Sequence, residues 1–329
     1  MRSLGVLMSK LVICTGSDSN LFFLAKGLVL SLRRILPIYD AELVFFDLGC
    51  TPRELAWLQA RTHRILIPKD DLEVAGLAGY APHKLGLTIR PFLPRYAPGY
   101  DIYLWIDADA WVQDSTVIQY YIRGAEKGAA AVSPEVDIAY PFMQHLPSAI
   151  QFQRYKFGQW ADAFGEDIAR RMSLLPLINA GVYAINADPL LWEKWAENFR
   201  LTLRNGMTGL CDQVALQKTL VELNRINALP SRANWMSHYA LPHRRAEDGV
   251  WIEPRFAGQP IGIVHLIAAV RRETYLRHGM LYEGGDYLSP EEVPENLREA
   301  FLAGRRRPII QEPSPGMRPL ASGQRPAQE

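Results

Sequence analysis

The sequence predicts an α/β fold in which a mainly parallel sheet carries helices on both faces. Short apolar runs rich in branched residues alternate with amphipathic stretches through the first half of the chain, as expected when helices connect parallel strands. The 329 residues, 48% of them hydrophobic and 22% charged, can bury a large core without disulfides or a structural metal. We therefore expect one domain over residues 1–303, with a first half at 10–132 and a second at 133–272.

The first half should contain four strands separated by helices. The apolar runs that predict strands are 10–15, 41–46, 64–67 and 101–106. Apolar residues at helical spacing over 21–35 predict a helix that ends before Pro37. Ligands of such sheets bind beyond the carboxyl ends of the strands, so polar residues that follow the first and fourth strands should lie close together.

Two further helices carry clear local signals. Thr51-Pro52-Arg53-Glu54 combines a capping threonine, a proline at the first helical position and a glutamate three residues after the cap. The helix expected over 84–96 contains Pro91 and Pro94, which should kink or shorten it.

The second half begins less regularly. Residues 133–173 are aromatic, contain three prolines and show few strand signals, so we expect irregular structure there. Later elements should be a strand at 177–186, a helix after Asp188, a helix at 211–223, a strand at 261–267 and a helical end at 273–303. Residues 304–329 are rich in Pro, Gly, Arg and Ser and predict a disordered tail.

Charge and cysteine content narrow the choice of partners. The net charge of +1 gives no reason to expect a nucleic-acid partner. Three cysteines lie far apart and form no CxxC pair, which favours a reducing, cytoplasmic compartment. No apolar run approaches the roughly 20 residues that span a bilayer. Peripheral contact with the inner face of a membrane stays open, since 305–307 are arginines beside Phe301 and Leu302.

An apolar strand runs directly into two acids, Asp107 and Asp109. On extended backbone, residues i and i+2 point the same way, so the two carboxylates should face one another and repel. A divalent cation is the natural partner of such a pair. A pair of acids in a turn after a strand is the alternative, and the short motif alone does not separate the two.

The surrounding residues, YLWIDADAWV, resemble the metal motif of GT-A glycosyltransferases, particularly the retaining enzymes around glycosyltransferase family 8. Further segments occur in that family's order: Asn179-Ala180-Gly181, Asp212-Gln213 and His265. The resemblance covers residues 10–272 and implies a Rossmann-like GT-A fold. It also implies hexosyl transfer from a nucleotide-diphosphate sugar to a glycan, lipid-linked sugar or protein, in the synthesis of glycans or bacterial cell-surface polysaccharide. The implied cofactor is Mn²⁺ or Mg²⁺, and residues 133–173 would contribute to acceptor binding.

The resemblance assigns roles to individual residues. The metal ligands would be Asp107, Asp109 and His265. The donor would contact Thr15, Asp18, Lys84, Arg90, Asp107, Ala108, Asn179, Ala180, Gly181 and Arg271. The catalytic residues would be Asp109, Asp212 and Gln213. Retention is implied by the resemblance; an inverting enzyme would need a base, for which Glu135 and Asp137 are candidates.

Structural roles compete with several of these assignments. Asp18 and Asp212 could cap helices, Lys84 and Arg90 could belong to solvated helix faces, and His265 could be a buried core histidine. The chain also departs from the family, with Leu21 in place of a base-stacking aromatic residue and Ala268 in place of a glycine. A sugar nucleotidyltransferase and a catalytically inactive GT-A-like module that binds sugar or protein are the rival functions; the first should have an early glycine-rich basic loop.

Overall fold

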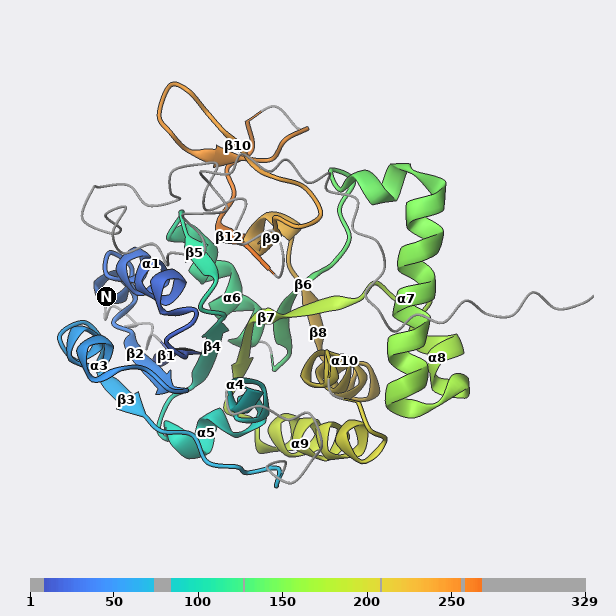
Figure 1. Cartoon of the computed structure of the whole chain (residues 1–329), viewed down its shortest axis with the longest axis horizontal. Helices are drawn as coiled ribbons and strands as arrows, with labels where there is room; N and C mark the ends of the chain where they lie inside the picture. The colour runs from blue at the N-terminus through green and yellow to red at the C-terminus, as the bar shows by residue number, and fades with distance from the viewer. Residues whose placement is uncertain (1–8, 74–83, 127, 208, 256–257, 268–329) are drawn as a thin grey trace, which may run out of the picture.

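The computed structural model describes residues 9–73, 84–126, 128–207, 209–255 and 258–267. Its centre is a seven-stranded sheet in the order β3-β2-β1-β4-β7-β6-β8 (Figure 1). The strands are β1 (Leu11–Ser17), β2 (Glu42–Asp47), β3 (Arg64–Leu66), β4 (Ile102–Ile106), β6 (Ala130–Pro134), β7 (Ile178–Asn186) and β8 (Ile226–Ala228). All pairs are parallel except the two that β7 makes with β4 and β6. The prediction of a mainly parallel sheet is confirmed.

Helices cover both faces of this sheet. Along β1, Val12 and Cys14 belong to one apolar cluster, and Leu11 and Ile13 belong to another, because successive side chains of a strand point to opposite faces. The first cluster includes buried residues of α9 (Pro189–Arg204) and α10 (Cys211–Leu223), and the second includes those of α1 (Phe22–Leu32) and α6 (Thr116–Glu126). The α10 helix has the limits that the sequence predicted.

The local signals near the N-terminus are borne out with small shifts. The capping box is present at α3 (Pro52–Gln59): the Glu54 amide donates to Thr51 Oγ1, and Glu54 Oε2 accepts from the Thr51 amide. The first helix ends at Leu32 instead of 35, and Pro37 lies in the first turn of the short α2 (Leu36–Tyr39). Proline is tolerated there because the first helical amides have no partner within the helix.

The helix expected over 84–96 is broken into three pieces, as its prolines predicted. The pieces are α4 (Leu85–Thr88), η2 (Arg90–Phe92) and α5 (Leu93–Tyr96). Pro91 and Pro94 each lie within the first two positions of a new piece. The break leaves Arg90 almost completely buried, whereas Arg95 is exposed.

The expectation of irregular structure over 133–173 was wrong. After β6, this stretch forms η3 (Pro141–Gln144), the long α7 (Leu146–Phe164) and α8 (Glu166–Met172), which stand together at one side of the molecule (Figure 1). Pro147 lies in the first turn of α7 and does not interrupt it, and Trp160 and Ala163 bury one side of the helix. Proline content misled the prediction because the position of a proline, and not its presence, decides whether a helix breaks.

A second, three-stranded sheet brings the end of the described chain to the acid motif. Its order is β5-β12-β9, with β5 (Ala110–Val112), β12 (Ile263–His265) and β9 (Trp235–Met236). The short η4 (Ser231–Ala233) precedes β9, and a hairpin of β10 (His243–Arg244) and β11 (Trp251–Ile252) lies between β9 and β12. His265 pairs with Ala110 in this sheet, immediately after Asp109.

Some predicted features lie outside the described residues. They are Arg271, the helical end at 273–303 and the disordered tail at 304–329. Within the described ranges, no helix combines the length and the apolar character needed to cross a bilayer.

Candidate active site

The two acids occupy a tight turn where β4 ends and β5 begins. The Asp107 amide donates to the carbonyl of Gly181 in β7 (2.7 Å), and the Ala110 amide donates to the carbonyl of Asp107 (2.9 Å). The Leu266 amide donates to the carbonyl of Asp109 (3.0 Å). Both sheets therefore hold the backbone of the motif, at the carboxyl edge of β4.

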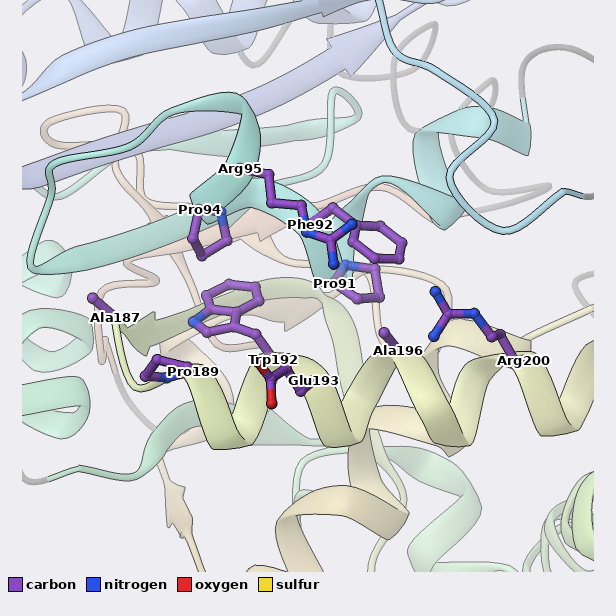
Figure 2. A pocket seen from close by; sticks show the side chains of 10 residues that line it. All are labelled: Pro91, Phe92, Pro94, Arg95, Ala187, Pro189, Trp192, Glu193, Ala196 and Arg200. Atoms are coloured by element: carbon purple, nitrogen blue, oxygen red, sulfur yellow. The ribbon is translucent and has the colours of Figure 1, made fainter.

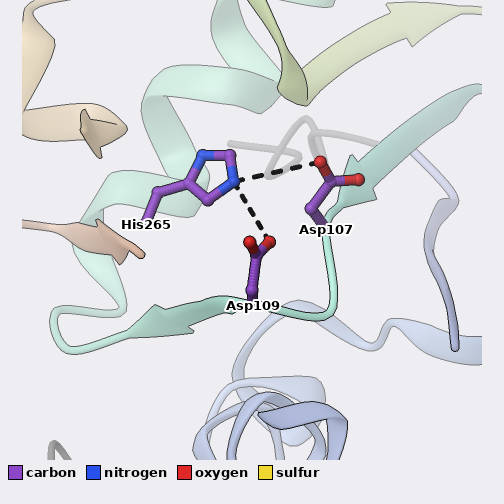
Figure 3. A group of neighbouring side chains, drawn as sticks. All are labelled: Asp107, Asp109 and His265. Atoms are coloured by element: carbon purple, nitrogen blue, oxygen red, sulfur yellow. Dashed lines mark ion pairs between the residues drawn. The ribbon is translucent and has the colours of Figure 1, made fainter. Parts of the chain in front are cut away.

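His265 completes a three-residue cluster with the acids. Its Nε2 lies 3.2 Å from Asp109 Oδ1 and 3.9 Å from Asp107 Oδ2, and Figure 3 shows the ring edge turned toward both carboxylates. One potential ligand atom from each residue lies within 4.8 Å of the other two. Asp109 and His265 are buried, while the Asp107 side chain is 25% exposed, so the cluster is reached from the Asp107 side.

The second nitrogen of the His265 ring has a fixed partner. Nδ1 lies 2.9 Å from Asn234 Oδ1, and the Asn234 side-chain NH₂ donates to Asn179 Oδ1 (2.9 Å). The amide oxygen of Asn234 faces the ring and can accept a hydrogen bond from an Nδ1–H; this tautomer has its lone pair on Nε2. Metal-binding histidines are held in this way, with the second nitrogen donating to an oxygen.

Gly181 makes room for the cluster. A Cβ at this position would lie 2.2 Å from His265 Cε1 and 2.7 Å from Asp107 Oδ2, which no side chain can do. Two carboxylates, an imidazole nitrogen and this clearance fit a divalent cation. The sequence predicted that a backbone or a sugar approaches Gly181 closely, whereas in the structure the side chains of His265 and Asp107 do so.

Arg90 ties the acid motif to α10. Its guanidinium donates to Asp107 Oδ1 (2.5 Å), Asp212 Oδ2 (2.6 Å) and the Ala180 carbonyl (3.1 Å), and it lies 5.0 Å over the Trp105 ring. The Trp105 indole N–H also donates to Asp107 Oδ1 (2.7 Å), so Oδ2 of Asp107 is the oxygen turned toward His265. The alternative of a solvated Arg90 is wrong.

Asp212 does not cap its helix. The N-cap of α10 is Leu210, without a side-chain hydrogen bond, and Asp212 lies buried in the first turn facing Arg90. Capping was the structural alternative for Asp212, and it is excluded because its carboxylate is used in a buried ion pair.

The carboxylates of Asp107 and Asp109 repel one another. Burial raises the pKa of the Asp107 carboxyl above its ordinary value; the Arg90 guanidinium counteracts this effect and the Asp109 carboxylate adds to it. A cation between two such groups relieves both their repulsion and their desolvation.

Glu135, one of the two candidate bases, is a hydrogen-bond acceptor for three side chains. Oε1 accepts from Asn179 Nδ2 (3.0 Å) and Gln213 Nε2 (3.1 Å), and Oε2 accepts from the Tyr239 hydroxyl (2.7 Å). Burial raises the pKa of Glu135, and the three donors oppose the rise because they stabilise the carboxylate. Gln213 Oε1 in turn accepts from the Ala180 amide (3.1 Å), so both ends of this amide are held.

The second candidate base is also occupied. Asp137 accepts from the Ala139 amide (2.7 Å) and from the Ser231 hydroxyl. Asn234 and Tyr239 were not among the predicted site residues. The sequence signal for Asn234 was the Asn234-Trp235 pair, which resembles a WN segment of glycosyltransferase family 8 in reversed order. The contacts of both residues come from the three-dimensional packing.

Four further described residues were predicted to contact the donor: Thr15, Asp18, Lys84 and Ala108. Thr15 is fully buried in β1, and Ala108 lies in the turn between the acids. Asp18 Oδ1 accepts from the Leu21 amide (3.2 Å), but the N-cap of α1 is Leu21, and no side chain caps that helix. Lys84 precedes α4. Burial raises the pKa of the Cys211 thiol to about 12, and the charge of Lys84 opposes this rise, so Lys84 lies near the start of α10.

A hollow of about 230 Å³ lies away from these groups, between η2, α5 and α9 (Figure 2). Its lining includes Phe92, Ala187 and Trp192. Ala187 follows β7, which runs opposite to β4, so the hollow lies at the sheet edge opposite the acid motif. It is therefore separate from the candidate site.

No model of a protein family and no curated protein sequence matches the chain. Among solved structures, the galactosyltransferase LgtC in complex with donor and acceptor sugar analogues has a TM-score of 0.50 and 18% identity, covering 88% of this chain and 99% of LgtC. An active-site Gln-to-Glu mutant of LgtC gives 0.50 and 17% identity, with coverage of 87% and 99%. The apo bifunctional glycosyltransferase WbbM gives 0.51 and 13%, covering 90% of this chain and 52% of WbbM. The chain therefore has the GT-A fold of these glycosyltransferases.

Proposed function

We propose that this protein is a glycosyltransferase that moves a sugar from a nucleotide-diphosphate sugar to an acceptor hydroxyl. The observation that carries the proposal is the cluster of Asp107, Asp109 and His265 at the carboxyl edge of the sheet, where α/β folds bind nucleotides. The shared fold supports it, since LgtC was solved with donor and acceptor sugar analogues.

The cluster would hold a divalent cation through Asp107 Oδ2, Asp109 Oδ1 and His265 Nε2. Such a cation neutralises negative charge that develops on a leaving diphosphate. The imidazole favours Mn²⁺ over Mg²⁺, because Mg²⁺ prefers an all-oxygen shell. Arg90 keeps Asp107 in place from the opposite side and counters the charge of the pair.

The donor sugar would lie beside Gly181, Asn179 and Gln213. The Gln213 amide is fixed at both ends, so its orientation is set before any substrate binds. The glutamine mutated in LgtC belongs to that enzyme's active site, and Gln213 is a buried glutamine of the candidate site here.

We favour retention of the anomeric configuration. An inverting transfer needs a carboxylate free to take the acceptor proton, and both candidates are occupied by hydrogen bonds within the protein. A retaining transfer does not require either of them. A glycan is the acceptor we favour, in line with the acceptor sugar analogue of LgtC.

The test is turnover and binding of a panel of UDP-, GDP- and dTDP-sugars, with Mn²⁺ and with EDTA. We expect one donor to be turned over only with the metal. Asp109→Asn, which removes one ligand charge without changing volume, should lower this activity by at least about 100-fold. The matched control is Asp167→Asn, an exposed carboxylate on α8 that pairs with Arg170, which should leave turnover unchanged. If no donor binds with or without metal, the proposal fails, and a binding module becomes the better account.

A further inference from the structure

We infer that Glu135 is a positioning residue that sets the tautomer of His265 through two buried asparagines. The inference rests on the proposed metal site and concerns how its histidine is held in the tautomer that can bind a cation. Asn179 and Asn234 connect Glu135 to His265 in an unbroken series of hydrogen bonds of 2.9 to 3.0 Å. All four side chains are at most 6% exposed, so water does not compete for these bonds.

The direction of the series is fixed at the Glu135 end. The Ala180 amide donates to Gln213 Oε1, so Gln213 must direct its NH₂ group at Glu135 Oε1. The same Glu135 oxygen accepts from Asn179 Nδ2, so Asn179 presents its NH₂ group to Glu135. Its oxygen then faces the other way, where it accepts from Asn234 Nδ2 and from the Gly181 amide (both 2.9 Å). Gly181 N–H, which cannot rotate, reinforces the same orientation.

The orientation of the second asparagine, Asn234, follows from that of Asn179. Because the NH₂ group of Asn234 donates to Asn179, the Asn234 oxygen faces His265 and accepts a hydrogen bond from Nδ1–H. The imidazole is thereby left with a lone pair on Nε2, the atom 3.2 Å from Asp109. The opposite tautomer would point Nε2–H at Asp109, bond to that carboxylate and close the site to a cation.

This role differs from that of a general base. A base must lose and gain a proton, whereas a positioning acceptor needs only an oxygen directed at Asn179 and Gln213. Glu135→Gln can supply this oxygen, since its Oε1 can still accept from both amides and its NH₂ can face the Tyr239 oxygen. Glu135→Leu can not.

The test is the tautomer of His265 in the metal-free protein, read from ¹⁵N–¹H correlation NMR at a pH above the ordinary imidazole pKa of about 6.5. We expect Nδ1–H in the wild type and in Glu135→Gln. Asn234→Leu and Glu135→Leu should shift the population to Nε2–H. The matched control is Asn198→Leu, an equally buried asparagine that bonds Thr219 and Glu222 on another part of the fold and should leave the tautomer unchanged.

Mn²⁺ affinity, measured by calorimetry, gives an independent readout. Loss of a partner of this kind should weaken binding by about 10- to 100-fold in Asn234→Leu and Glu135→Leu, and Glu135→Gln should bind like wild type. An Nε2–H tautomer in the wild type, or an unchanged tautomer in folded leucine variants, would overturn the inference. The wild-type spectrum decides even if a leucine variant does not fold. Neither readout uses sugar transfer, so a protein without transferase activity would still reveal the tautomer.

Discussion

Arg90 and Arg95 belong to the same interrupted helical segment, yet they face opposite edges of the sheet. Arg90 is 5% exposed and lies between the carboxylates of Asp107 and Asp212. Arg95 is exposed at the hollow of the opposite edge, where its guanidinium and that of Arg200 lie 4.8 and 5.8 Å from the Phe92 ring (Figure 2).

The contrast between Arg90 and Arg95 shows that charged side chains are buried at the edge of the sheet that carries Asp107 and Asp212. A buried ion pair contributes little net stability, because desolvation of both groups offsets their attraction. A buried arginine with two carboxylates at one edge is therefore better explained by the need to hold Asp107 than by the stability of the fold. Arg95 is exposed and Arg200 is half-buried, and side chains of this kind cover apolar surface at little cost while their charged heads stay near water.

The largest effect should come from Arg90→Met. It leaves the Asp107 and Asp212 carboxylates buried without their cation, which should lower the free energy of unfolding by about 3–5 kcal/mol. Arg95→Met, the matched change at the other edge, should shift it by less than about 1 kcal/mol. Urea denaturation measures both. Equal losses in the two variants would refute the contrast between the edges.

Gly181→Ala should have the next largest effect. Its Cβ cannot fit beside His265, so the site must move, at a cost of about 1–3 kcal/mol and with weaker Mn²⁺ binding. Gly158→Ala on α7 is the control, since nothing lies within 4 Å of the added methyl. Removing a helical glycine should raise stability there by up to about 1 kcal/mol. Thermal unfolding and calorimetric titration of Mn²⁺ would show a tolerant Gly181 if the packing argument is wrong.

The site edge should also be the more sensitive to acid. Burial is the largest cause that lowers the pKa of His238 from 6.5 to about 4, and the Asp109 carboxylate opposes this shift, so the folded protein holds the His238 ring neutral. The unfolded chain binds the proton first, and stability is therefore lost as pH falls from about 6.5 toward 4. Denaturation at pH 7.5 and at pH 5 should show a smaller acid loss in His238→Gln than in the wild type. Identical losses would mean that His238 does not contribute.

The smallest effect is expected for Arg200→Met. Its guanidinium lies on the rim of the hollow, and its removal should change stability by about 0.5 kcal/mol or less. Mn²⁺ affinity and donor turnover should equal those of the wild type. A clear loss of either would show that the two edges are coupled, which their positions in the sheet do not suggest.

Much of the fold follows from local sequence. The apolar strands, the capping box at Thr51 and the limits of α10 are set by neighbouring residues, so short-range patterns predict them. The misjudged stretch over 133–173 shows where this fails. The same prolines that disrupt a helix interior are harmless in its first turn, and the pattern alone did not locate that turn.

The sequence by itself determined that two acids follow a buried strand and that a histidine ends a later one. Only the tertiary structure decided that these groups meet, that Arg90 bonds to Asp212, and that Asn234 orients His265. Hydrogen-bond partners so distant in the chain leave no periodic trace, because periodicity reports which face of an element is buried and not what that face contacts. The candidate ligands could thus be predicted from sequence and their supporting contacts could not.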